Sequence, residues 1–169
     1  KTLNIACFKN DPKDPHSLSS GSVWSFVEDK TGMLWVGTDE GLNKFDPKTG
    51  KFSQIISDKS VFALFEDKSV SLWVGAMGAL NKLVQGVTEG SPPIFIQYKP
   101  DPQDPNSLSH GSVMSILEDN KGAFWIATQH GGLNKFDRKT GKFIHYKHDP
   151  EDPNSISSNK LWSLIEDKT

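Results

Sequence analysis

The sequence predicts an all-β chain of β-propeller blades, each a four-stranded antiparallel meander. The chain has 169 residues and returns to the same sequence phase after 138 of them, as Trp24 and Trp162 show. Within that distance one motif occurs three times, as WVGT at Trp35, WVGA at Trp73 and WIAT at Trp125. The period is therefore 46 residues, a length typical of one propeller blade. Runs of β-branched and aromatic residues between turn residues indicate strands rather than helices.

The period divides the chain into about three and a half blades, a partial β-propeller over 1–169. The middle copy lacks the Asp-Pro segment but has an insertion. Because the chain begins at Lys1 and stops inside a repeat at Thr169, we expect it to be a segment of a longer protein. The expected parts are an outer strand of a preceding blade (1–10), blade 1 (11–56), blade 2 (57–99, insertion near 84–93), blade 3 (100–148), and the linker and inner strand of the next blade (149–169).

Each repeat contains four expected strands. The first is SVWSFVED with copies SVFALFED, SVMSILED and KLWSLIED, and the second is MLWVGT with copies SLWVGA and AFWIAT. The third is GLNKFD with copies ALNKLV and GLNKFD, and the fourth is KFSQI with copies IFIQY, KFIHY and the N-terminal NIACF. The first two strands are apolar on both faces and should be covered on both, whereas the outer two are wetter.

Large and small residues in these strands predict how blades pack. The five tryptophans recur at fixed repeat positions, so packing in the core is a better interpretation than stacking on sugars. Two residues after the motif tryptophans stand Gly37, Gly75 and Ala127, small enough for a neighbouring blade's side chain to approach closely.

The turns account for the recurring aspartates. EDKTG and EDNKG end in a glycine suited to a left-handed position, and FDPKTGK resembles a type I turn followed by a bulge. Hydrogen bonds to backbone N–H groups of their own turns are expected in place of calcium binding for Asp29, Asp46, Asp119 and Asp137.

The proline-rich segments DPKDP, DPQDP and DPEDP cannot pair as ladder strands, because proline lacks a backbone donor. They suit the crossing from the outer strand of one blade to the inner strand of the next. Side-chain bonds to the turn backbone are expected for Ser17, Ser107 and Ser155.

Composition excludes several classes of protein. The net charge of −2, with no basic cluster, argues against nucleic acid, and no apolar run is long enough for membrane contact within this segment. The single Cys7 is expected to be a small apolar strand residue.

His145 and His148 would point to opposite faces of a continued strand, so neither a metal nor a cofactor is expected. No nucleophile–base constellation appears, so this segment is expected to be non-catalytic.

The stretch SLSSGSVWSFVEDKTGMLWVGTDEGLNKFDPKTGKF resembles the two-component regulator propeller repeat. That family combines V-x-S-I-x-E-D-x-x-G-x-L-W-I-G-T-x-x-G-L-N-x-F-D with D-P-x-x-P-x-S-L-S linkers, and the middle copy departs from it at Ala76 and Ala79. The resemblance implies a seven-bladed ring in the periplasmic sensor region of a membrane-bound regulator, often a hybrid histidine kinase. It also implies an oligosaccharide or other small polar ligand and a periplasmic or extracytoplasmic location.

In a propeller, the linker into the first strand and the loop between the second and third strands share one face, the usual ligand face. Positions that vary there are candidates for binding and equally for neutral drift. The candidate ligand-binding residues are Asp39, Glu40, Met77, His110, Gln129, His130, Asn159 and Lys160.

Two functions stay open on the sequence alone. One is a sensor segment that binds such a ligand and relays the signal to a cytoplasmic output domain. The other is a non-catalytic protein–protein interaction scaffold. In either case three blades with open ends cannot close a ring, and we expect self-association through those ends.

Overall fold

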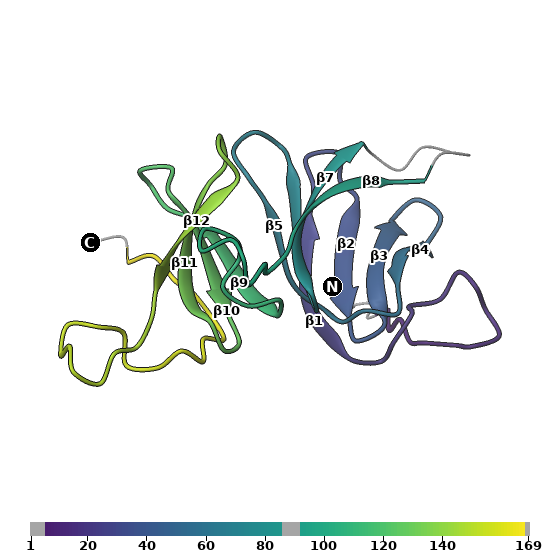
Figure 1. The fold of residues 1–169 in the computed structure, drawn as a ribbon. Coiled ribbons are helices and arrows are strands. Elements are labelled where there is room, and N and C mark those ends of the chain that lie inside the picture. The colour runs from purple at the N-terminus through teal and green to yellow at the C-terminus, as the bar shows by residue number, and fades with distance from the viewer. Residues whose placement is uncertain (1–5, 86–91, 168–169) are drawn as a thin grey trace.

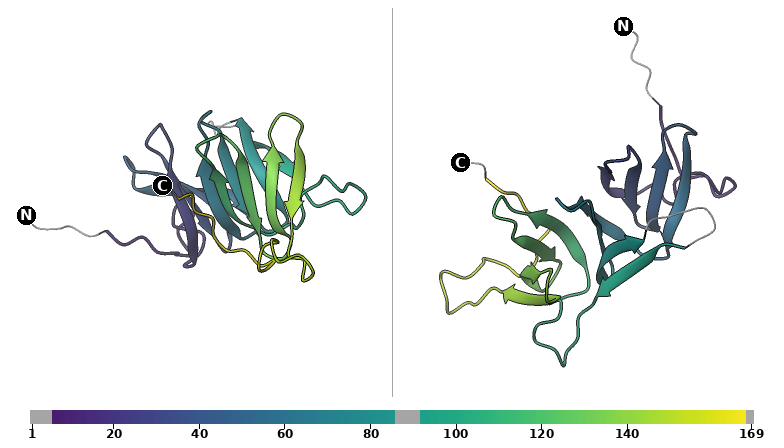
Figure 2. Two further views of the ribbon diagram at one scale, coloured as in Figure 1. Left: turned by 90° about the vertical axis from the view of Figure 1, so that its left-hand side faces the viewer. Right: turned by 90° about the horizontal axis from the view of Figure 1, so that it is seen from above.

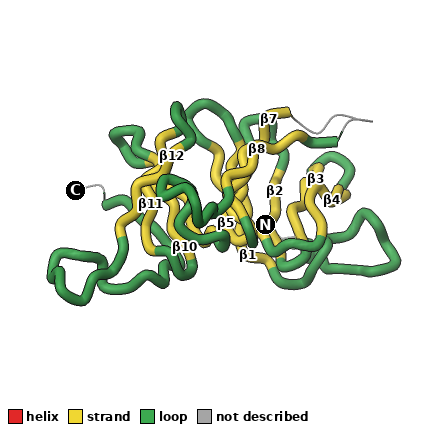
Figure 3. The backbone as a smooth tube through the Cα atoms, in the orientation of Figure 1, coloured by secondary structure: helices red, strands yellow, loops and turns green. Residues whose placement is uncertain are grey.

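The computed structural model describes residues 6–85 and 92–167, and within them every regular element is a strand (Figures 1 and 3). The strands form three four-stranded antiparallel meanders, as predicted. Blade 1 contains β1 (Val23–Glu28), β2 (Leu34–Thr38), β3 (Gly41–Asp46) and β4 (Lys51–Ser57). Blade 2 contains β5 (Val61–Glu66), β6 (Leu72–Ala76), β7 (Ala79–Gln85) and β8 (Ile94–Tyr98). Blade 3 contains β9 (Val113–Glu118), β10 (Phe124–Thr128), β11 (Gly132–Asp137) and β12 (Lys142–Tyr146).

The three sheets lie side by side and follow one another along an arc (Figure 2, right). The first strand of each blade packs on the first strand of the next, β1 on β5 and β5 on β9. The largest buried cluster joins β6 and β7 of blade 2 to the strands of blade 3, with Trp73 and Phe124 at its centre. Blades therefore share their core with their neighbours, as expected for strands that are apolar on both faces.

Glycines at the blade interfaces fulfil the predicted packing role. A Cβ atom on Gly37 would lie 2.7 Å from Val61 Cγ1 of the next blade, and one on Gly75 would lie 2.6 Å from Val113 Cγ1. Both valines are fully buried. A small residue two positions after the tryptophan is therefore what lets the first strand of the following blade dock.

The first-hairpin aspartates hold the motif tryptophans. Asp29 Oδ1 accepts the backbone N–H of Thr31 at 2.8 Å, while Asp29 Oδ2 accepts Trp35 Nε1–H at 2.8 Å. The bonds from Trp73 to Asp67 and from Trp125 to Asp119 repeat this at 2.8 and 2.9 Å. The predicted bonds to their own turns are confirmed for all four aspartates, Asp29, Asp46, Asp119 and Asp137.

Hydrogen bonds pull the carboxylates of these turns towards the charged form. The pKa of Asp29 lies below its ordinary value, because bonds from Thr31, Trp35 and Met33 together outweigh the opposing effect of burial. In the turn between β3 and β4, the backbone N–H of Lys48 is the main cause of the lowered pKa of Asp46. The turns are therefore fixed by ionised side chains at neutral pH.

The Asp-Pro linkers form the same loop three times (the first is purple and the last yellow in Figure 1). In the first, the backbone N–H of Asp11 donates to Ser17 Oγ at 2.9 Å, and Ser17 Oγ–H donates back to the Asp11 carbonyl. The other two linkers repeat both bonds, between Asp101 and Ser107 and between Asp149 and Ser155. The predicted serine-to-backbone bonds are confirmed. Blade 2 follows blade 1 without such a loop, through a turn at Asp58 with a φ of 60°.

Two predicted end strands are not strands in the described residues. The segment 160–167 and residues 6–8 belong to no sheet. The strand beside which each would pair is not among the described residues. Cys7 is accordingly exposed rather than a buried strand residue, a correction to the prediction. Phe8 still packs edge-to-face on Phe45 and Phe52, at ring centroid distances of 4.9 and 5.6 Å. Residues 1–5 and 168–169 of these predicted strands lie outside the described residues.

The open side of blade 1 corrects the predicted burial of its first strand. Val23 and Phe26 are 48% and 72% exposed, whereas the equivalent Val113 and Ile116 of blade 3 are 0% and 9% exposed. The difference arises because no blade in the described residues precedes blade 1. The insertion also begins later than predicted, because β7 continues to Gln85; residues 86–91 lie outside the described part of the chain.

Candidate ligand-binding rim

One face of the molecule gathers the turns between second and third strands beside the entries to the first strands. Backbone bonds join them in every blade, from Asp39 N to Ser22 O at 3.2 Å and from Met77 N to Ser60 O at 2.8 Å. In blade 3 the bond runs from Gln129 N to Ser112 O at 3.0 Å. The predicted common face is thus confirmed. We call it the linker rim, defined by residues 20–24, 39–40, 58–62, 77–78, 109–114, 129–131 and 158–160.

Trp24 and Asp39 form the first feature of the linker rim. Trp24 Nε1–H donates to Asp39 Oδ1 at 2.6 Å, and the indole is 50% exposed beside Phe62 of the next blade. The β1–β2 register shifts between Val23 and Ser25, so Trp24 sits at a bulge. The indole is exposed on the open side of blade 1, as Val23 and Phe26 are, because no blade in the described residues precedes blade 1.

Trp24 and Trp162 correct the prediction that the tryptophans serve packing. The indoles of Trp35 and Trp73 are buried, but Trp24 and Trp162 are 50% and 60% exposed. The same register shift occurs at Phe62 and Met114, the residues equivalent to Trp24. Met114 is nevertheless only 8% exposed, so the exposure of Trp24 follows from the open side of blade 1 and not from the register shift.

His110 and His130 form the second feature. Their rings lie 5.2 Å apart, edge to face, and come from the blade 3 linker and the β10–β11 turn. His110 Nδ1 accepts the backbone N–H of Ser112 at 3.2 Å. Burial lowers the pKa of His110 below the usual histidine value, and the positive form of His130 lowers it further. His110 therefore favours the neutral form, with Nε2–H left as a donor.

Met77 contributes to a third feature, a hollow between blades 1 and 2. Its volume is about 180 Å3, and Lys59, Met77, Asn81 and Gln97 are among its lining residues. Met77 is 52% exposed. The Gln97 amide donates to Asn81 Oδ1 at 2.9 Å, so the polar wall is fixed by hydrogen bonding. The hollow combines a flexible apolar side chain with amide groups.

Glu40 lies at the edge of the loop formed by the first Asp-Pro linker. A polar hollow of about 360 Å3 is enclosed there by residues that include Asp11, Ser17, Glu40 and Gln54. The Gln54 amide donates to the Glu40 carbonyl at 3.0 Å. Blade 3 has an equivalent hollow of about 350 Å3 with His145 in the position of Gln54.

Asn159 and Lys160 lie on the C-terminal segment against blade 3. The carbonyl of Asn159 accepts Gly132 N–H at 3.0 Å, and its Oδ1 accepts His148 N–H at 2.8 Å. Asn159 therefore ties the last linker to β11. Lys160 N–H donates to Ser158 Oγ at 3.0 Å, and Lys160 is exposed.

The predicted residues thus form several small groups rather than one pocket. The structure brings His110 to His130, but sets Asp39 with Trp24 and Met77 with Lys59 in separate places along the rim. His145 and His148 bond to different carbonyls, those of Ser107 at 2.7 Å and Ile156 at 2.9 Å.

Sequence reasoning missed the buried asparagines under the rim. Asn43 Oδ1 accepts Ser19 N–H at 3.2 Å and its amide donates to Ser19 Oγ at 2.8 Å, so it pins the linker to β3. Asn134 does the same to Ser109. In blade 2, without a linker, the bond to Asn81 comes from Gln97. The signal was available, because Leu-Asn-Lys recurs unchanged in all three third strands.

The described residues contain no group of three or more His, Cys, Asp or Glu side chains placed to hold a metal ion. None of their segments forms a helix with the length and apolar character needed to cross a membrane.

Parts of this chain are similar to a known protein family, to a curated protein and to solved structures. Residues 17–40 and 107–130 match the family described as two component regulator propeller. A 34-residue stretch is 59% identical to histidine kinase P4 of Formosa agariphila, covering 20% of this chain and 2% of that kinase.

The fold of this chain is similar to solved structures of extracellular domains. The extracellular domain of a protein described as a hybrid two component system of B. thetaiotaomicron superimposes with a TM-score of 0.73 at 25% identity. The match covers 90% of this chain and 20% of that one. A second such extracellular domain from the same organism gives a TM-score of 0.61 at 23% identity, over 82% of this chain and 18% of the other, and shows the fold alone. The chain therefore spans about a fifth of these structures.

Proposed function

We propose that this chain, which carries two-component regulator propeller repeats, is a ligand-sensing segment of a bacterial signalling receptor. The linker rim would bind an oligosaccharide or another small polar ligand, and the signal would pass to an output domain outside these residues. The likeness to the extracellular domain of a hybrid two component system supports a sensor role and an extracytoplasmic location.

The observation that carries the ligand proposal is the exposed indole of Trp24, held by Asp39. An aromatic face packs against the C–H face of a sugar ring, while a neighbouring carboxylate accepts its hydroxyl groups. Asp39 Oδ1 fixes the indole at 2.6 Å and leaves Asp39 Oδ2 available to a hydroxyl. Phe62 extends the aromatic surface into blade 2, since its ring centroid lies 5.5 Å from that of Trp24.

The histidine pair supports the same chemistry further along the rim. Neutral His110 keeps one ring N–H as donor, and His130 is exposed beside it. Neutral donors and acceptors suit an uncharged polar ligand, because a sugar offers hydroxyl groups and no charge to balance. The rim therefore offers an aromatic platform and adaptable hydrogen-bonding groups on one face.

A calorimetric screen of this chain against a panel of neutral and acidic oligosaccharides tests the proposal. We expect saturable binding of at least one oligosaccharide, weakened about tenfold by Trp24→Ala through loss of stacking and hydrogen bonding. Asp39→Asn should weaken it as well. The matched control is Lys121→Ala on the opposite face, which should leave binding unchanged.

Two results would count against the proposal. If no oligosaccharide binds while the chain is folded by circular dichroism, the ligand class is wrong. If Lys121→Ala weakens binding as much as Trp24→Ala, the site is not on the linker rim.

A further inference from the structure

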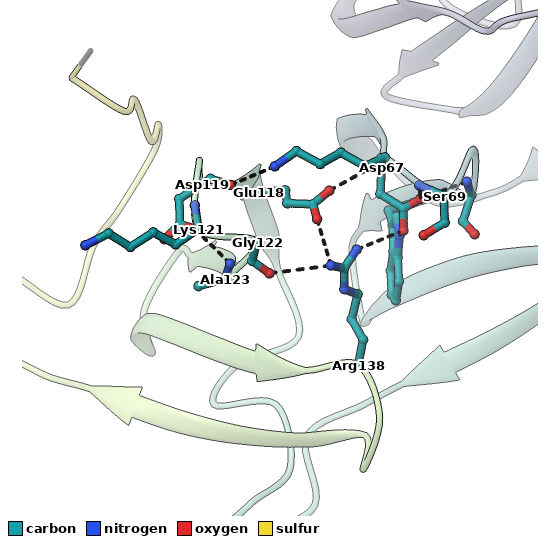
Figure 4. A network of polar contacts seen from close by, with 11 residues as sticks. Asp67, Ser69, Glu118, Asp119, Lys121, Gly122, Ala123 and Arg138 are labelled. Carbon is teal, nitrogen blue, oxygen red and sulfur yellow. Dashed lines mark hydrogen bonds and ion pairs between the residues drawn. The ribbon is translucent and has the colours of Figure 1, made fainter. Parts of the chain in front are cut away.

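On the face opposite the linker rim, an arginine closes the interface between blades 2 and 3 (Figure 4). Arg138 follows β11 and donates from Nη1 to Asp67 Oδ2 of blade 2 at 3.2 Å, and from Nη2 to Glu118 Oε1 at 2.7 Å. The two carboxylate side chains are only 1% and 3% exposed. The guanidinium also lies 5.0 Å from the centre of the Phe124 ring. Two acids and an apolar wall thus enclose one planar cation.

The interface between blades 1 and 2 repeats both acids. Asp29 is equivalent to Asp67, because each accepts the indole N–H of its motif tryptophan through Oδ2. Glu66 is equivalent to Glu118, because Oε2 of each accepts a backbone N–H from the preceding blade's first hairpin. These donors are Lys30 at 3.3 Å and Lys68 at 3.1 Å.

The arginine is not repeated. The sequence after the third-strand lysine is Phe136-Asp137-Arg138 in blade 3 but Leu83-Val84-Gln85 in blade 2, where the register of β7 on β8 shifts between Leu83 and Gln85. The structure has a hollow of about 340 Å3 here, lined by Asp29, Glu66, Leu72 and others. Leu72 stands where blade 3 has Phe124, so the apolar wall is kept, and no arginine lines the hollow among the described residues.

Lys44, one of the two lysines that line the hollow, does not replace the guanidinium. Lys44 lies over the Trp35 ring, with Nζ 5.4 Å from its centre. Its equivalent Lys82 lies over Trp73 in the same way at 5.3 Å, next to the occupied site. An ammonium at this position therefore coexists with a bound guanidinium. Asp29 is ionised at neutral pH, because the hydrogen bonds of its turn hold its pKa below the usual value despite burial.

We propose that the hollow between blades 1 and 2 is a binding site for a guanidinium group, with Asp29 Oδ2 and Glu66 Oε1 as acceptors and Leu72 as the apolar wall. A planar guanidinium spans two carboxylates through two N–H groups, which a compact ammonium cannot do. The ligand is a small guanidinium compound or an arginine side chain of a polypeptide. The site lies on the face opposite the linker rim, so it is independent of the proposed function.

Trp35 supplies a direct reporter, because its indole N–H donates to the Asp29 oxygen that would receive the ligand. Titration of the 15N-labelled chain with methylguanidinium should shift the Trp35 indole resonance saturably and leave that of Trp73 unchanged, since Arg138 already occupies the second site. Methylammonium is the matched probe and should shift neither resonance. Glu66→Gln keeps an acceptor for the Lys30 N–H but removes the charge, and should weaken binding at least about tenfold.

A reciprocal variant completes the test. Arg138→Gln should empty the second site and make the Trp73 resonance responsive. The dispersion of the indole resonances in each spectrum establishes that the variant is folded.

Several outcomes would overturn the proposal: no saturable shift at Trp35, an equal response to methylammonium, or a Trp73 resonance that stays unresponsive in folded Arg138→Gln. The source of the guanidinium is distinguished by a capped Gly-Arg-Gly peptide. Tighter binding of the peptide than of methylguanidinium indicates an arginine of a polypeptide, and equal binding indicates a small solute; both results support the site.

Discussion

The backbone N–H of Asn120 donates to Glu166 Oε1 at 2.8 Å, across the interface between blade 3 and the C-terminal segment. Both complete blade interfaces contain the same bond, from Lys30 to Glu66 and from Lys68 to Glu118. Leu161 N–H also donates to the Thr128 carbonyl at 3.2 Å. The segment 160–167 therefore occupies the position of a first strand although it belongs to no sheet, so docking on the neighbouring blade does not require pairing within a sheet.

The first strand of blade 1 exposes apolar side chains, and we therefore predict that the chain self-associates. Val23 and Phe26 are largely exposed on blade 1, although their equivalents in blade 3 are buried. Apolar surface of this kind favours contact with a second copy. We expect light scattering to show dimers or larger species for the chain and a shift towards monomer for Phe26→Lys. A monodisperse monomer for the unmodified chain would refute the prediction.

Gly75→Ala should destabilise the protein by about 1–3 kcal/mol, because overpacking forces neighbours to move. The added Cβ would lie 2.6 Å from Val113 Cγ1 and 3.0 Å from the Val113 carbonyl oxygen. The control is Gly21→Ala, since a Cβ there has nothing within 4 Å. Urea denaturation should show a lower midpoint for Gly75→Ala alone, and equal midpoints for the two variants would contradict this role of Gly75.

Val70→Gly should stabilise the protein by about 1 kcal/mol, because a left-handed conformation is costly for a β-branched residue. Val70 has a φ of 65°, while the equivalent Gly32 and Gly122 have φ values of 81° and 80°. Val70 is 51% exposed, so its removal sacrifices little packing. The thermal unfolding midpoint should rise; an unchanged or lower midpoint would show that the contacts of Val70 outweigh its backbone strain.

Asp67 makes stability depend on pH at the acid end. Its pKa lies below the ordinary value: burial opposes the charge, but bonds from Trp73, Ser71 and Ser69 and the charge of Arg138 prevail. Its contribution is complete above the unfolded pKa of about 3.9 and is lost as the pH falls through the lower folded pKa.

The free energy of unfolding should therefore fall as the pH is lowered below about 4, and less steeply in Asp67→Asn. Urea denaturation across this pH range measures both slopes. Parallel curves for the two proteins would show that Asp67 does not contribute to the acid sensitivity.

Strand order and blade docking could be predicted from the sequence, because both depend on local patterns. Runs of β-branched and aromatic residues identify strands, and Gly37 and Gly75 recur beside the tryptophans that they accompany. The exposure of Trp24 could not be predicted, because it depends on which neighbouring blades are present. The hollow beside Asp29 also escaped prediction, since its lining residues, such as Asp29, Glu66 and Leu72, lie far apart in the sequence.

The candidate rim was predictable as a face but not as a set of contacts. Propeller connectivity alone brings Asp39, Met77 and Gln129 to one side. It does not say that Asp39 holds an indole or that the His110 and His130 rings meet, because such contacts depend on rotamers and on linker conformation.

The bonds of Asn43 and Asn134 to serines of the preceding linkers define where these proteins can be cut and recombined. A blade transplanted without its Asp-Pro loop would carry a buried amide with no partner, at a cost of about 1–3 kcal/mol. The exchangeable unit is therefore the loop together with the four strands that follow it, as in Asp11–Ser57 or 101–146. Blade 2 alone can be exchanged from its first strand onward, because Gln97 travels with Asn81 inside the same sheet.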